Sequence, residues 1–176
     1  MANDNSRRKF IKKLSSSTLF AIAAPTIIAE AASVKDKGIQ ILKRKSKVPA
    51  NDRINIASIG LGIMGFGNLK AALSREGVEL VSGADCYDGH LLRLKELYGT
   101  DIKTTRNYEE ILDDPAVDGV IISTPDHWHA RQAIAAMKKG KAVYCEKPMV
   151  KRMEEGNEII SAHKESKLAF QVGSQW

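Results

Sequence analysis

Apolar runs alternate with helical patterns of apolar residues from residue 53 to the end of the chain. The short runs rich in β-branched residues predict six strands, at 54–59, 78–84, 102–105, 117–124, 141–145 and 168–173. Apolar residues at helical spacing predict helices between them, at 64–75, 91–98, 108–114, 129–140 and 151–166. Such alternation favours a mostly parallel sheet covered on both faces, with right-handed crossovers. The pattern therefore predicts a doubly wound α/β Rossmann domain with strand order 3-2-1-4-5-6.

Three glycines, Gly60, Gly62 and Gly65, follow the first predicted strand in the sequence GLGIMG. In such a turn the first glycine allows the tight bend, the second lets a pyrophosphate approach the backbone, and the third lets the helix pack closely. The N-terminus of the following helix offers free backbone N–H groups to phosphates. We expect these donors at Ile63 and Met64.

Asp85 lies at the end of the second predicted strand, about 20 residues after the glycine turn, the distance expected for the acid of a dinucleotide site. A carboxylate there accepts hydrogen bonds from the adenosine ribose and repels a 2′-phosphate, which favours NAD over NADP. The alternative is a glycine loop and a solvated aspartate on an unrelated α/β domain. The strand, the turn, the helix and the acid together favour the dinucleotide site.

The residues before 53 differ in composition from the rest of the chain. Residues 1–31 combine a basic start that contains Arg7 and Arg8, a modestly apolar middle, and small residues at Ala29 and Ala31. This pattern predicts a twin-arginine signal peptide and export to the periplasm or outside the cell; the alternative is a basic amphipathic helix. Residues 32–52 are predicted to be a basic linker, and residues 53–176 the Rossmann domain.

The formal net charge of +6 does not indicate a nucleic-acid partner. The excess of Lys and Arg lies before residue 51, and the predicted domain carries slightly more Asp and Glu than Lys and Arg, so a basic patch is not expected. No uncharged apolar stretch reaches the length of about 18 residues that a membrane span requires. Cys86 and Cys145 form neither a disulfide framework nor a metal site; we expect both to be small buried thiols.

Two further segments, STPDHWHA at 123–130 and YCEKP at 144–148, give the chain a recognisable resemblance. Together with GLGIMG they resemble the Gfo/Idh/MocA oxidoreductases, a family that includes glucose–fructose oxidoreductase and inositol dehydrogenase. The resemblance covers residues 53–176. It implies transfer of hydride between a sugar, polyol or glycoside hydroxyl and the nicotinamide of NAD, with the cofactor supplying the chemistry.

The resemblance also implies a set of site residues. Thr124, Pro125 and His129 would meet the cofactor at the end of the fourth strand, with His127 and Trp128 as neighbours of the cofactor or the substrate. For His127, a packed or capping role is an equally good interpretation. Many family members have Asn at position 126, where this chain has Asp.

Glu146 and Lys147 would line the nicotinamide end of the site. By the same resemblance, Lys147 would be the catalytic residue, contacting the substrate hydroxyl and the cofactor. Its charge would hold an alkoxide-like oxygen as hydride leaves the adjacent carbon; the alternative is an exposed lysine after a strand. The family often has a cis bond at the position of Lys147–Pro148.

Family members continue into a second α/β domain, which carries most substrate contacts and a histidine that acts as acid or base. That domain is absent from the 176 residues, so we expect a cofactor site and half of a catalytic site, and a homo-oligomer only where the second domain is present. Two alternatives follow. One is an NAD-binding module without activity of its own, and the other is an NAD-dependent glycosidase, a branch in which the EKP segment is typically altered, whereas Lys147 is intact here.

Overall fold

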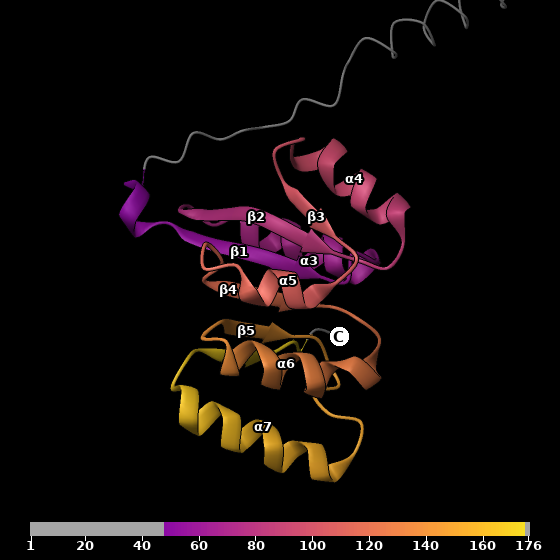
Figure 1. The fold of residues 1–176 in the computed structure, drawn as a ribbon, viewed down its shortest axis with the longest axis vertical. Coiled ribbons are helices and arrows are strands. Elements are labelled where there is room, and N and C mark those ends of the chain that lie inside the picture. The colour runs from indigo at the N-terminus through magenta and orange to yellow at the C-terminus, as the bar shows by residue number, and fades with distance from the viewer. Residues whose placement is uncertain (1–47, 175–176) are drawn as a thin grey trace, which may run out of the picture. The chain divides into compact units, whose positions relative to one another are not determined.

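The computed structural model describes residues 48–174, and within them six strands form one parallel sheet. The predicted signal peptide and most of the predicted linker lie outside the described residues. The strand order is β3-β2-β1-β4-β5-β6 (Figure 1), which confirms the predicted Rossmann order. The strands are β1 (Ile54–Ile59), β2 (Val78–Ala84), β3 (Lys103–Thr105), β4 (Gly119–Ile122), β5 (Ala142–Cys145) and β6 (Phe170–Val172).

Helices follow the strands in the predicted alternation. They are α3 (Ile63–Leu73), α4 (Asp88–Tyr98), α5 (Tyr108–Asp113), α6 (His129–Lys138) and α7 (Met153–Ser166), with 3₁₀ turns η1 (Ala50–Asp52) and η2 (Asp126–Trp128). Asn107 caps α5, because its side chain accepts from the Glu109 N–H at 3.0 Å. The Asn107 N–H itself donates to Thr105 Oγ1 at 3.0 Å.

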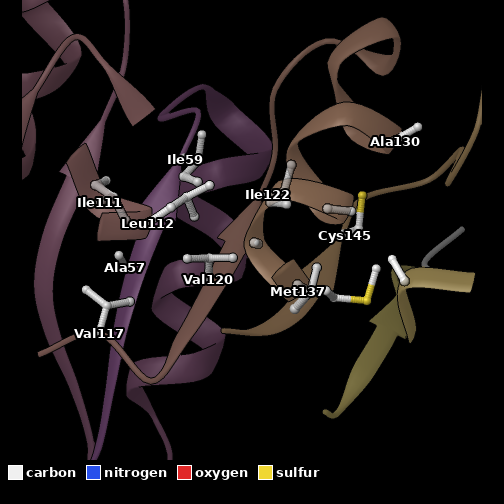
Figure 2. Packing of buried hydrophobic residues seen from close by; sticks show 14 of the residues in the cluster. Ala57, Ile59, Ile111, Leu112, Val117, Val120, Ile122, Ala130, Met137 and Cys145 are labelled. Carbon is white, nitrogen blue, oxygen red and sulfur yellow. The ribbon is translucent and has the colours of Figure 1, made fainter. Parts of the chain in front are cut away.

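The two faces of the sheet pack against different helices, because side chains alternate between the faces along each strand. In β4, Val120 and Ile122 belong to the larger core cluster with α5, α6 and α7, whereas Ile121 belongs to the smaller cluster with α3 and α4. Figure 2 shows the larger cluster, with Met137 of α6 near β4 and β5. The helices thus cover both faces of the sheet, as the fold class requires.

The carboxyl ends of the central strands meet at one edge of the sheet. Ile59 at the end of β1 pairs with Ala84 of β2 on one side and with Ile122 of β4 on the other, and Ile122 pairs with Cys145 of β5. The turns after these strands therefore begin side by side. In open α/β sheets ligands bind at this edge, and every predicted site residue lies close after one of these strands.

The two cysteines have different environments. Cys145 is buried, and burial, reinforced by the negative charge of Glu146, raises the pKa of its thiol to about 12. The prediction of a buried thiol is wrong for Cys86, which is exposed. Cys86 comes one residue after Asp85, where the chain leaves the sheet edge. Among residues 48–174 no helix has the length and apolar character needed to cross a bilayer.

Candidate functional site

The glycine turn after β1 combines two glycines that the fold requires with one that it does not. Gly60 has φ +86°, and a Cβ there would lie 2.7 Å from the backbone of Ser123. A Cβ on Gly65 would overlap the carbonyl oxygen of Gly60. Gly62 has an ordinary φ of −73°, and a Cβ there would meet no atom within 4 Å. Packing explains Gly60 and Gly65, whereas Gly62 borders open space at the N-terminus of α3.

The N-terminus of α3 is free to bind an anion. Gly62 is the N-cap residue and no side chain caps the helix, so the first backbone N–H groups keep their hydrogen-bonding capacity. Ile63 and Met64, where these donors were expected, are the first two residues of the helix, and their side chains are 93% and 45% exposed. An unhindered helix N-terminus beside a glycine without a packing role fits a pyrophosphate.

Asp85 follows β2 and is held by three hydrogen bonds. Its Oδ2 accepts from the Leu61 N–H at 2.7 Å and lies 3.1 Å from His90 Nδ1, and its Oδ1 accepts from the Tyr87 N–H at 2.8 Å. Burial opposes the ionisation of Asp85, but the N–H groups of Tyr87 and Leu61 and the ring of His90 outweigh it and lower the pKa. Asp85 is therefore an anion that also fixes the glycine turn through Leu61.

A cavity of about 760 Å³ extends from the glycine turn past Asp85, a volume within the range of small-molecule sites. Gly60, Gly62 and Asp85 line one side of it. The rest of its wall comes from residues after β2, β3 and β4, among them Cys86, His90, Arg106, Asn107, Tyr108, Thr124, Pro125, Trp128 and Gln132. Thr124 and Pro125 thus lie where they were expected, and Thr124 Oγ1 donates to Gln132 Oε1 at 2.7 Å.

A second cavity of about 230 Å³ adjoins the first, because Ser123 and Thr124 line both. Its other lining residues are Met64, Asp126, His129, Glu146 and Lys147. Lys147 is exposed, and the bond between Lys147 and Pro148 is cis, as the resemblance implied. Most of the predicted residues therefore lie along these two adjoining cavities, a track that runs from Asp85 past the glycine turn to Lys147.

Glu146, a predicted site residue, is buried in a polar network with Asn68 and Ser123, which were not predicted. It is 5% exposed, and its Oε1 accepts from Asn68 Nδ2 at 2.7 Å, while Asn68 Nδ2 also donates to Ser123 Oγ at 3.2 Å. Asn68 thus joins α3 to the ends of β4 and β5. The one sequence signal for it is a polar residue one turn after Gly65, on the face of α3 that packs on the sheet.

His129 is buried in the wall of the smaller cavity. Its Nδ1 lies 2.7 Å from the carbonyl oxygen of Pro148, and its Nε2 lies 2.7 Å from that of Thr124. His129 therefore connects the turn that carries Lys147 to the turn after β4. These contacts give it a positioning role, and its contact with the cofactor stays a prediction.

His127 lines neither cavity. Its side chain is 57% exposed and lies 3.5 Å from Asp126 Oδ1. The adjacent Trp128 lines the larger cavity instead, with the Arg131 guanidinium 5.2 Å from its ring centroid. Of the two predicted neighbours of the cofactor or substrate, the geometry therefore favours Trp128, and it gives no support to His127.

A glycine turn at a helix N-terminus, an ionised acid at the end of β2 and two adjoining cavities at the sheet edge define a dinucleotide-binding Rossmann domain. Comparison with known proteins specifies the family. Residues 54–174 match the Gfo/Idh/MocA profile, described as an oxidoreductase family with an NAD-binding Rossmann fold, and the chain belongs to this family.

Three relatives illustrate the range of the family around this chain. It is 32% identical over 122 residues to scyllo-inositol 2-dehydrogenase (NAD(+)) of Bacillus subtilis, which covers 69% of this chain and 35% of the relative. It is 31% identical over 166 residues to a glycosyl hydrolase family 109 protein of Shewanella baltica, in an alignment that covers 88% of this chain and 36% of the relative. The crystal structure of myo-inositol 2-dehydrogenase from Lactobacillus plantarum superposes with a TM-score of 0.64 at 29% identity. The superposition covers 69% of this chain and 36% of that structure. The chain thus spans about a third of the length of these relatives.

Proposed function

We propose that this domain binds NAD and serves an oxidoreductase that transfers hydride between a polyol or sugar CH–OH group and nicotinamide. The observation that carries the proposal is the continuous track from Asp85 past Gly62 to Lys147. Asp85 would bind the adenosine ribose, Gly62 and the N-terminus of α3 the pyrophosphate, and the cavity beside Met64 and Lys147 the nicotinamide.

The preference for NAD rests on the charge of Asp85. The lowered pKa keeps this carboxylate ionised, so it accepts a hydrogen bond from a ribose hydroxyl and repels a 2′-phosphate. Arg106 lines the same cavity but its nearest acidic partner is Asp88, with Nη1 3.6 Å from Oδ2. Arg106 is therefore paired with an acid, whereas Asp85 lines the cavity as a carboxylate next to the glycine turn.

At the other end of the track, Lys147 would orient the substrate. Bound NAD supplies the hydride acceptor, and the ammonium group of Lys147 would hold the substrate oxygen as charge develops on it. Glu146 keeps the turn in place, since its Oε2 accepts from the Lys147 N–H at 3.1 Å and its Oε1 is held by Asn68. These contacts support Lys147 as the catalytic residue of the proposed reaction.

The polyol class is supported by the names of the relatives, which include inositol dehydrogenases. Export by the twin-arginine route, to the periplasm or outside the cell, belongs to the same proposal and is supported by Arg7 and Arg8 before a modestly apolar stretch. An exported enzyme of this kind would carry its cofactor with it.

A second candidate, an NAD-dependent glycosidase, is favoured by one observation. The match to the glycosyl hydrolase family 109 protein covers 88% of the chain, more than the residues after 48 can supply, so it extends into the N-terminal segment. The inositol dehydrogenase match covers 69%. The intact Lys147 keeps the dehydrogenase as the first candidate.

Titration calorimetry of the full chain with NAD and NADP tests the cofactor site. We expect NAD to bind more tightly than NADP, and Asp85→Asn to weaken NAD binding about tenfold and to narrow the difference between the two cofactors, because a charged hydrogen bond contributes about 1.5–3 kcal/mol. Asp113→Asn is the matched control, since Asp113 is an exposed acid that pairs with Lys139 and lines neither cavity. A folded chain that binds neither cofactor would refute the proposal.

The reaction is tested by mixing the chain with NAD and either an inositol or a nitrophenyl glycoside. Formation of NADH from the inositol would support the dehydrogenase. Release of nitrophenol without net NADH would favour the glycosidase, in which the cofactor is reduced and reoxidised within one turnover. NAD binding with neither activity would leave the chain as a binding module.

A further inference from the structure

The hydrogen-bonding capacity of Asp85 is largely used within the protein. A carboxylate offers about four acceptor positions. The Leu61 N–H and His90 occupy Oδ2, and the Tyr87 N–H occupies one position of Oδ1. One position therefore remains for the cofactor, although the adenosine ribose of NAD presents two hydroxyl groups. His90 is the one side chain among the three partners, so it can rotate away from Asp85, whereas the two backbone groups are fixed.

We propose that His90 makes the choice between NAD and NADP depend on pH, by competing with the ribose for Asp85 and by adding a positive charge beside the 2′ position. This inference rests on the proposed binding of a dinucleotide. His90 is on α4, lines the larger cavity, and its side chain is 39% exposed, so solvent protons reach it. Histidine side chains change charge between about pH 5 and 8.

The groups around His90 determine whether its protonation favours NAD or NADP. The rings of Phe66 and Tyr87 contact it edge-on, with centroids at 6.4 and 5.0 Å. Asp85 contacts it directly, Asp88 lies two residues before it on α4, and Arg106, 3.6 Å from Asp88, lines the same cavity. Arg106 also lines the cavity and its side chain is 67% exposed, which leaves it free to turn toward a ligand.

Protonation of His90 affects the two cofactors in opposite directions. The imidazolium binds Asp85 more tightly than the neutral ring does, so a ribose hydroxyl must displace a stronger partner and NAD affinity falls. The same charge offsets the repulsion between Asp85 and a 2′-phosphate and, with Arg106, attracts that phosphate, so NADP affinity rises. Asp85 stays ionised throughout because its pKa is lowered. The preference for NAD should therefore shrink as the pH falls.

The test is the ratio of the dissociation constants for NADP and NAD, measured with the full chain from about pH 8 to about pH 5.5. We expect this ratio to fall about tenfold in the wild type and only about twofold to threefold in His90→Gln, in which the residual change comes from the titration of the 2′-phosphate itself, near pH 6. His163→Gln is the matched control, because His163 is exposed on α7; it should behave as the wild type.

A second measurement needs no variant. If protonated His90 opposes NAD binding, NAD binding must release protons within the range in which histidine side chains change charge, about pH 5 to 8. This release appears in calorimetry as a dependence of the heat on the ionisation enthalpy of the buffer. Equal pH dependence in the wild type and His90→Gln, or NAD binding without proton release, would overturn the role of His90 while leaving the NAD site intact. Failure of both cofactors to bind at every pH would refute the proposed function, and with it this inference.

Discussion

Replacing Gly62 by valine is expected to weaken NAD binding by at least about 100-fold, or roughly 2.7 kcal/mol, while the chain stays folded. The backbone at Gly62 has an ordinary φ and a Cβ there meets no protein atom, so the substitution causes no internal clash. Its cost to folding is limited to the poorer N-cap, about 1 kcal/mol. The added methyl groups would instead occupy the space in which the pyrophosphate approaches the N-terminus of α3.

Gly67 and Gly65 provide the controls for this prediction. Gly67 is exposed on the same helix with no atom near a Cβ, so Gly67→Ala should raise stability by up to about 1 kcal/mol without changing NAD affinity. Gly65→Ala should destabilise the fold, because its Cβ would overlap the backbone of Gly60. Calorimetry and thermal unfolding separate the three outcomes. Undiminished NAD binding by Gly62→Val would place the pyrophosphate elsewhere.

The sequence predicts the topology and one end of the site well, because both depend on local pattern. The apolar run at 54–59 and the glycines after it belong to contiguous segments, and the spacing from Gly65 to Asp85 follows from the length of one helix and one strand. Parallel strands then bring Asp85 beside the glycine turn without any long-range information. The bounds of β4 were less predictable. The strand is hydrogen-bonded to its neighbours over Gly119–Ile122, whereas the predicted strand extends over 117–124.

The hydrophobic pattern of the sequence does not predict in which direction each residue of a short turn points. Residues 126–128 form the 3₁₀ turn η2 directly before α6, and this turn directs His127 to solvent and Trp128 to the cavity. The helical periodicity that places apolar residues on buried faces does not apply to a three-residue turn. The resemblance located the segment correctly and named both His127 and Trp128, but only Trp128 of the two lines a cavity.

The sequence pattern also fails to predict the buried polar side chains that form hydrogen bonds between distant elements. Asn68 reaches Glu146 across a sequence separation of 78 residues. Lys141, at the start of the predicted fifth strand, is buried, with its ammonium group donating to the carbonyl oxygens of Asp114 and Val117 at 2.7 and 2.8 Å. Each contact depends on the positions of two or three elements at once, and a single sequence gives no signal for such a combination.

His129→Ala is expected to lower the free energy of unfolding by about 3 kcal/mol. The substitution removes a buried ring whose nitrogens lie 2.7 Å from the carbonyl oxygens of Thr124 and Pro148. It leaves a cavity and takes a hydrogen-bond donor from these carbonyls, and an unsatisfied buried group costs about 1–3 kcal/mol. The control, His127→Ala, removes an exposed side chain two residues away and should change the free energy of unfolding by less than about 0.5 kcal/mol. Urea unfolding followed by circular dichroism measures both.

The same substitution should act on the site, because His129 connects the turn after β4 to the turn that carries Lys147. Without the ring, the two turns lose their common hydrogen-bonding partner, and the smaller cavity loses one of its walls. We therefore expect His129→Ala to weaken NAD binding at temperatures where the variant is still folded, and His129→Gln, whose amide N–H can satisfy one carbonyl, to recover part of both losses. Equal stability of the His129→Ala and His127→Ala variants would show that the two carbonyls find other partners, and that His129 does not hold the turns together.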